Sequence, residues 1–195
     1  LRGDPMHGEH RFSAVNGGYD HSDALVSQIH QLNQGKFLDE RYQGGNGTSF
    51  CVGVAGYPEK HLESPNLDKD IEMLKRKIDA GAQYIVTQLF FINERYYDFV
   101  DKCRAHHIEV PIIAGIKPIQ RKRDIELLPQ TFNVDLPNSL VCAIENAKDP
   151  SEVRKIGLEY CVNQVEDLVR QDVPGVHFYT QGKATAIAKV VEATF

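Results

Sequence analysis

The sequence predicts an α/β fold in which strands and helices alternate and the strands form a parallel sheet. Short apolar runs such as 83–91 and 110–116 have the continuous pattern of strands buried on both faces. Each run is followed by a segment whose apolar residues recur at helical spacing, which indicates βαβ units. The 195 residues are 42% hydrophobic and 25% charged, so we expect a single domain over 1–195.

The first elements are a helix and a strand joined by a polar connection. Residues 22–33 place Leu25, Ile29 and Leu32 on one helical face. A glycine-rich stretch, 44–47, precedes the strand expected over 49–55. Because these glycines come before a strand and do not open a helix, we interpret them as a flexible connection.

The clearest helix of the sequence lies between the strands expected at 49–55 and 83–91. Leu67, Ile71, Leu74 and Ile78 recur at spacings of four, three and four residues. Acidic residues occupy its first turn and basic residues its last, as the helix dipole favours. Gly81 stands where a glycine commonly ends a helix.

The same alternation continues to the end of the chain. We expect strands over 110–116 and 175–180 and helices at 123–128, after Pro137 and over 184–193. Asn93 is expected to cap the helix that follows the strand at 83–91. Asp149, with Pro150 next and Glu152 at the third helical position, predicts another helix start.

Composition and charge exclude several classes of function. A net charge of −5 and scattered basic residues predict no nucleic-acid partner, although Lys117 and the run 121–123 leave a site for a small anion open. The apolar stretches are too short to cross a bilayer. Four widely spaced cysteines are typical of reduced, mostly buried thiols in a cytoplasmic protein. Two matches to extracellular motifs, 2–4 and 46–48, matter only in a secreted protein and are therefore set aside.

Polar and aromatic side chains follow each expected strand. In parallel β/α folds the functional site lies at the carboxyl ends of the strands, so these side chains are expected to gather there. Together they suit a large, flat heteroaromatic ligand. The segments concerned are Arg2–Pro5, Tyr57–His61, Thr87–Phe91, Lys117–Gln120 and His177–Thr180.

Five segments in one order resemble the methylenetetrahydrofolate reductase family. The resemblance extends over almost the whole chain. The segments are Leu1-Arg2-Gly3-Asp4-Pro5, Val54-Ala55-Gly56-Tyr57-Pro58-Glu59-Lys60-His61, Lys77-Ile78-Asp79-Ala80-Gly81-Ala82 through Thr87-Gln88-Leu89-Phe90-Phe91, Pro111-Ile112-Ile113-Ala114-Gly115-Ile116-Lys117-Pro118-Ile119 and His177-Phe178-Tyr179-Thr180.

The resemblance implies a (β/α)₈ TIM-type barrel that holds FAD and reduces 5,10-methylenetetrahydrofolate with NADH or NADPH. Asp4 and Gln88 would be catalytic, with Asp4 at the flavin and Gln88 bonded to the pterin or nicotinamide. Leu128, Tyr179 and Lys183 would, with Gln88, bind substrate. The residues implied to bind the cofactor are Arg2, Gly3, Asp4, His21, Ser22, Tyr57, His61, Asp70 and Lys77.

The sequence departs from the family pattern in two places. Tyr179-Thr180-Gln181-Gly182-Lys183 replaces the usual Tyr-Thr-Leu-Asn-Arg, and lysine lacks the planar fork with which arginine grips a carboxylate. No segment matches the early Phe-Glu-Phe-Phe-Pro-Pro that carries the family's general acid. We therefore expect roughly the C-terminal half of the barrel, from the end of strand 4 through helix 8, and no reductase activity from this chain alone.

Two alternatives to the reductase stay open. One is a non-catalytic remnant of the same barrel that binds flavin or a partner protein, and plain surface charge for Asp70 and Lys77 would fit it. The other is a different enzyme on the same scaffold, since a fold does not fix a function. Nucleotide preference and oligomeric state are not readable, and a homo-oligomer of the full-length parent is compatible with the sequence.

Overall fold

The computed structural model describes residues 12–42, 45–182 and 184–195. Four parallel strands form one sheet in the order β1-β2-β3-β4, so each strand lies beside its neighbour in the chain. The strands are β1 (Gly53–Gly56), β2 (Tyr84–Thr87), β3 (Ile112–Ile116) and β4 (Val176–Phe178). The helices are α1 (Ser22–Asn33), the short 3₁₀ helix η1 (Glu40–Tyr42), α2 (Leu67–Asp79), α3 (Asn93–Ala105), α4 (Asp124–Phe132), α5 (Asn138–Glu145), α6 (Pro150–Arg170) and α7 (Thr185–Thr194).

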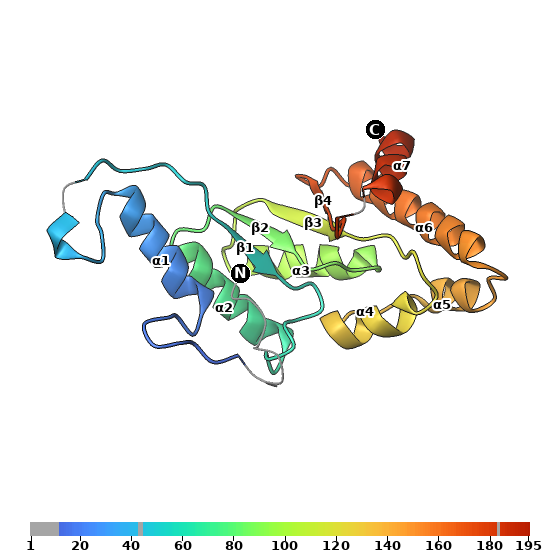
Figure 1. Cartoon of the computed structure of the whole chain (residues 1–195), viewed down its shortest axis with the longest axis horizontal. Coiled ribbons are helices and arrows are strands. Elements are labelled where there is room, and N and C mark those ends of the chain that lie inside the picture. Colours follow the sequence, from blue (N-terminus) through green and yellow to red (C-terminus); the bar gives the residue numbers. More distant parts are fainter. Residues whose placement is uncertain (1–11, 43–44, 183) are drawn as a thin grey trace.

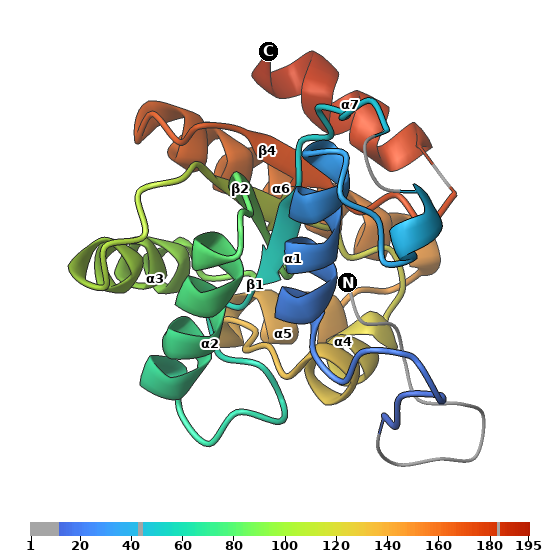
Figure 2. The ribbon, with the colours of Figure 1, turned by 90° about the vertical axis from the view of Figure 1, so that its left-hand side faces the viewer.

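The helices are arranged along the sheet in chain order. Figure 1 shows α1 and α2 side by side at one end of the molecule and α6 and α7 together at the other. Figure 2 views the same ribbon from the α1 end, with the strands in the middle and helices around them. Sequential parallel strands joined through helices confirm the predicted α/β fold class and correspond to consecutive units of a TIM-type barrel.

The two faces of the sheet differ in burial. Val54, Ile85 and Ile112 pair in one row across the strands, and at 4%, 0% and 1% exposure they belong to the core under α2, α3 and α6. The neighbouring row, which includes Val86 and Ile113, is only half-buried. Because side chains alternate across a strand, the second row marks the face turned away from the helices.

Helix starts were predicted with mixed success. The Asp149 side chain caps α6 by accepting hydrogen bonds from the backbone N–H groups of Ser151 and Glu152, as expected. The cap predicted at Asn93 is wrong, because Ile92 occupies the N-cap of α3. The Asn93 amide is buried and donates to the Gln164 carbonyl at 3.0 Å, so it joins α3 to α6.

The apolar run 83–91 is a shorter strand than its composition predicts. Pairing ends at Thr87, and the phenylalanines beyond it enter two different cores. Phe90 joins the core under the sheet, whereas Phe91 packs in a second cluster with Leu89 and Leu128. The run is continuously apolar because its residues pack into two cores. Only its first part, Tyr84–Thr87, is a strand.

Candidate active site at the strand ends

The residue that directly follows each strand contributes to one cavity. These residues are Tyr57, Gln88, Lys117 and Tyr179, and all four line a cavity of about 300 Å³. The Gln88 N–H donates to the Gly56 carbonyl at 2.8 Å, and the Tyr179 N–H donates to the Ile116 carbonyl at 2.9 Å. These bonds extend the ladder by one residue, so Gln88 and Tyr179 start from a rigid sheet edge.

Gln88 and Tyr179 are tied to this edge through their side chains. The Gln88 side-chain oxygen accepts from the Leu89 N–H at 2.9 Å. The Tyr179 hydroxyl donates to the Thr87 carbonyl at 2.8 Å, and burial raises the pKa of this phenol. The His177 ring meets the Tyr179 ring edge-on, with centroids 4.8 Å apart. Both cavity side chains are thereby held before any ligand binds.

Gly115 allows Thr87 and Tyr179 to pack closely against β3 beside this cavity. A Cβ atom at this position would lie 2.2 Å from the Thr87 carbonyl oxygen and 2.9 Å from the Tyr179 ring. The Gly115 N–H donates to the Thr87 hydroxyl at 2.9 Å, so β2 and β3 are also joined through a side chain. No residue larger than glycine fits here without displacing the strand or the tyrosine.

A second cavity of about 380 Å³ lies beside the first, and Ala55 and Tyr57 line both. It is bounded by the start of α1, the loop after β1 and α2. All of the described residues that the resemblance assigns to cofactor binding line it: His21, Ser22, Tyr57, His61, Asp70 and Lys77.

Asp70 organises the loop between β1 and α2. Its carboxylate accepts from the backbone N–H of His61 at 2.8 Å and from the Ser64 hydroxyl at 3.0 Å. The Tyr57 and His61 rings meet edge-on, with centroids 4.7 Å apart. Asp70 is half-buried and holds a cavity wall in place, so it does more than a solvated surface charge.

The remaining predicted residues do not join these groups. Leu128 is 6% exposed and packs in the second core cluster, outside the residues that line either cavity. Arg2, Gly3, Asp4 and Lys183 lie outside the described residues.

Three residues near the cavities were not predicted as site residues, although Glu59 lies within the strand-end segment Tyr57–His61. Gln181 and Phe132 line the smaller cavity with Lys117. Glu59 lies in the loop after β1, where its carboxylate accepts from the Asp135 N–H at 2.6 Å and burial raises its pKa to about 7. Gln181 was quoted only as a departure from the family pattern, and that departure was the one signal available for it.

Other expected features can also be placed. Cys103 and Cys161 are buried, but Cys51 and Cys142 are exposed, so the expectation of mostly buried thiols is wrong for half of them. Among the described residues no group of histidine, cysteine or carboxylate side chains is arranged to hold a metal ion. Within the same part of the chain, no helix has the length and apolar character needed to cross a membrane.

Parallel β/α units with polar and aromatic side chains at their strand ends define the class of barrel-type ligand-binding proteins and enzymes. The family described as methylenetetrahydrofolate reductase matches residues 1–194. The chain therefore belongs to the methylenetetrahydrofolate reductase family.

Individual relatives agree with this assignment. Methylenetetrahydrofolate reductase 2 of Saccharomyces cerevisiae is 33% identical over 98% of this chain and 30% of its own length. Methylenetetrahydrofolate reductase (NADH) 1 of Arabidopsis thaliana is 33% identical over 92% of the chain and 30% of its length. A probable methylenetetrahydrofolate reductase (NADPH) of Caenorhabditis elegans is 33% identical over 85% and 25%. The chain thus spans less than a third of the length of these relatives.

Proposed function

We propose that this chain carries the FAD- and substrate-binding strand ends of a reductase that converts 5,10-methylenetetrahydrofolate to 5-methyltetrahydrofolate with NADH or NADPH. One observation carries the proposal. The described cofactor residues, which come from three separate segments, line one cavity, and this cavity adjoins the one lined by Gln88 and Tyr179. A ligand that spans both cavities would meet polar groups at one end and aromatic walls at the other.

The residues of the larger cavity suit FAD. Lys77 supplies a cation, and Ser22, Tyr57 and His61 supply hydrogen-bonding groups of the kind that bind ribityl hydroxyls and phosphates. When bound there, FAD would supply hydride transfer between the nicotinamide and the folate. Asp70 would act through the loop it holds, because its oxygens already accept from His61 and Ser64.

The residues of the smaller cavity suit the two substrates in turn. We propose that the Gln88 amide binds the pterin or the nicotinamide, because Gln88 lines the cavity and its side-chain oxygen already accepts from the Leu89 N–H. Tyr179 would form a wall for the ring beside it. Asp4 and Lys183 keep the roles implied by the resemblance, as a catalytic carboxylate and a contact to the folate tail.

An absorbance experiment tests the proposal. The chain is purified with FAD, the flavin spectrum is recorded without oxygen, and NADH or NADPH is added, followed by methylenetetrahydrofolate. Bleaching by nucleotide and recovery with folate would support the reductase and would show that the expectation of no activity from this chain alone is wrong. Bound flavin that does not respond would favour the non-catalytic remnant. Bleaching without recovery would favour a reductase that lacks its general acid if the chain binds folic acid, and a different enzyme on this scaffold if it does not.

A pair of lysine variants tests the cofactor cavity. Lys77→Met removes the cation that lines the cavity, and we expect FAD affinity to fall about tenfold, or about 1.4 kcal/mol. Lys75→Met is the matched control, because Lys75 lies on the same helix, pairs with Asp79 and does not line the cavity. Equal FAD titration curves for the two variants would contradict the assignment of Lys77.

A further inference from the structure

Lys117 is a buried cation at the edge of the sheet. It directly follows β3 and is 6% exposed, although lysine is almost never fully buried without a partner. Its ammonium donates to the Gln181 side-chain oxygen at 2.9 Å. Burial lowers the pKa of Lys117, while the Asp124 carboxylate raises it and Arg121 lowers it further. The chain therefore bears a desolvation cost to keep an amine at this position.

Among the described residues, no other charged side chain lines the cavity of Lys117, although Asp124 and Arg121 lie close enough to affect its pKa. The cavity of about 300 Å³ is lined by apolar and aromatic side chains, by the amides of Gln88 and Gln181, and by one charged side chain among the described residues, that of Lys117. An ammonium has three donors, and a single bond to Gln181 uses one of them. The cavity thus combines flat walls with a hydrogen-bond donor of positive charge.

Gln181 fixes where this charge lies. Its backbone has φ of 48°, in the left-handed region that non-glycine residues seldom adopt. This conformation turns the chain after β4 so that the Gln181 oxygen reaches Lys117 from the end of the neighbouring parallel strand, 64 residues away in sequence. Gln181 is therefore a positioning residue for the ammonium.

We propose that Lys117 determines ligand specificity in this cavity by donating from its ammonium to a carbonyl oxygen on the edge of a bound heteroaromatic ring. The proposal rests on the proposed function and extends it, because the pterin and the nicotinamide both carry such an oxygen. A charge-assisted hydrogen bond discriminates strongly against an analogue that lacks the acceptor. Gln88, whose amide lines the same cavity, would bind the ring at a second point.

Two pairs of ligands separate the two sources of this oxygen. Folic acid and aminopterin differ in one ring substituent, an oxygen in the first and an amino group in the second. NADH and thionicotinamide NADH differ in the carboxamide, where sulfur replaces oxygen. We expect the chain to bind the oxygen-bearing member of one pair about tenfold more tightly, which corresponds to about 1.4 kcal/mol. The pair that shows this preference identifies the ring.

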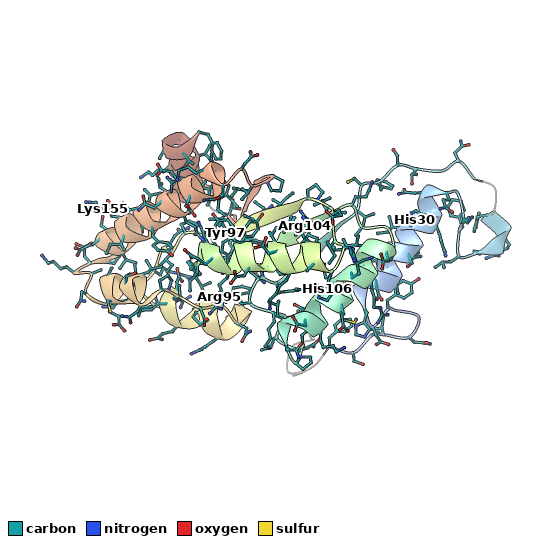
Figure 3. All side chains as sticks on the ribbon, turned by 180° about the vertical axis from the view of Figure 1, so that it is seen from behind. His30, Arg95, Tyr97, Arg104, His106 and Lys155 are labelled. Carbon is teal, nitrogen blue, oxygen red and sulfur yellow. The ribbon has the colours of Figure 1, made fainter. Side chains whose placement is uncertain are left out.

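Lys117→Met tests the residue itself, since methionine has a similar volume and no charge. We expect this variant to bind both members of the discriminating pair equally and to remain folded, because a buried charge is replaced by an apolar side chain. Lys155→Met is the control. Lys155 lies on α6, as Figure 3 shows, its side chain is 74% exposed, and the variant should keep the wild-type preference.

The outcomes distinguish this proposal from the proposed function. Equal preferences in the wild type and Lys117→Met would overturn the role of Lys117 and leave the reductase standing. Failure of the wild type to bind any of the four ligands would overturn both. A second measurement uses acetic anhydride labelling of Lys117, read by mass spectrometry. Saturating amounts of the preferred ligand should slow labelling about tenfold, and an unchanged rate would also overturn the role.

Discussion

The two cavities at the strand ends hold their polar groups in different ways. In the larger cavity, the Asp70 carboxylate accepts hydrogen bonds from His61 and Ser64, so its charge stabilises the loop. In the smaller cavity, the Lys117 ammonium, which has three donors, donates to one uncharged partner among the described residues, the Gln181 side-chain oxygen. The first arrangement shapes a wall, whereas the second leaves a charged group for a ligand. The number of partners that each charged group has among the described residues separates these two roles.

The largest effect is expected from breaking the wall of the larger cavity. Asp70→Ala leaves the His61 N–H and the Ser64 hydroxyl without their acceptor. Because hydrogen bonds to a charged group are each worth about 1.5–3 kcal/mol, we expect the free energy of unfolding to fall by about 3 kcal/mol. FAD affinity should fall with it. Urea unfolding measures the first quantity and a flavin titration the second.

Asp68→Ala is the matched control for this substitution. Asp68 lies in the same first turn of α2, so both variants lose the same favourable interaction with the helix dipole. Its partner is Lys102 at 3.7 Å, and the Asp68 side chain is 69% exposed, so its loss should cost less than about 1 kcal/mol. Equal losses of stability in the two variants would show that Asp70 acts only as a surface charge.

Glu59 joins the loop after β1 to the segment after α4 and should make stability depend on pH. It lies between Tyr57 and His61 in the loop after β1, and its carboxylate accepts from Asp135, three residues beyond Phe132 of the smaller cavity. One of its oxygens is buried without a partner among the described residues. The pKa is raised from 4.5 to about 7, mainly by burial and further by the Asp135 carboxylate, against the lowering effects of the Asp135 N–H and Arg95.

The direction of the pH effect follows from this raised pKa. Between pH 4.5 and about 7 the folded protein keeps a proton that the unfolded chain releases. The contribution of Glu59 to stability is therefore fully present below the unfolded pKa and is lost as pH rises through the folded value. Glu59→Gln mimics the protonated form, so it should remove this slope and be more stable than the wild type at about pH 8.

Thermal unfolding of both proteins across this pH range measures the effect. Other carboxyl groups titrate equally in the two proteins, so the difference in melting temperature isolates Glu59. The exposed Glu109 offers the control Glu109→Gln, which should follow the wild type at every pH. A difference between wild type and Glu59→Gln that does not change with pH would refute the raised pKa.

The sequence was sufficient for the parts of the fold that depend on local patterns. Apolar spacing located α1 at its observed bounds, and the Asp149 cap gave the start of α6. The prediction for Asn93 failed because two distant groups, on α6, compete for its amide and the helix start does not need it. A local rule cannot weigh partners that lie more than 70 residues away.

The same difference between local patterns and distant contacts applies to the site. Tyr57, Gln88, Lys117 and Tyr179 could be placed together because parallel strands bring the residues after them to one edge. The link between Glu59 and Asp135 could not, since 76 residues separate them and the contact depends on how α4 ends beside the loop after β1. Sequence patterns therefore located the cavity, while its electrostatics required the tertiary structure.

The smallest effect is expected at Tyr179, where ring and hydroxyl have separable roles. Tyr179→Phe removes the hydrogen bond to the Thr87 carbonyl and should lower the free energy of unfolding by about 1 kcal/mol. Because the hydroxyl proton is already used within the protein and the aromatic wall remains, folate affinity should stay within about twofold. Isothermal titration with folic acid, beside urea unfolding, measures both quantities.

Tyr160→Phe is the matched control for Tyr179→Phe. The Tyr160 hydroxyl also donates to a backbone carbonyl of the segment after β2, that of Phe91, but Tyr160 does not line either cavity. The two variants should therefore lose similar stability and leave folate binding unchanged. If Tyr179→Phe alone lowered folate affinity about tenfold, its hydroxyl would contact the ligand. The smaller cavity would then hold a second polar group available to ligand beside Lys117, and the contrast between the cavities would be sharper.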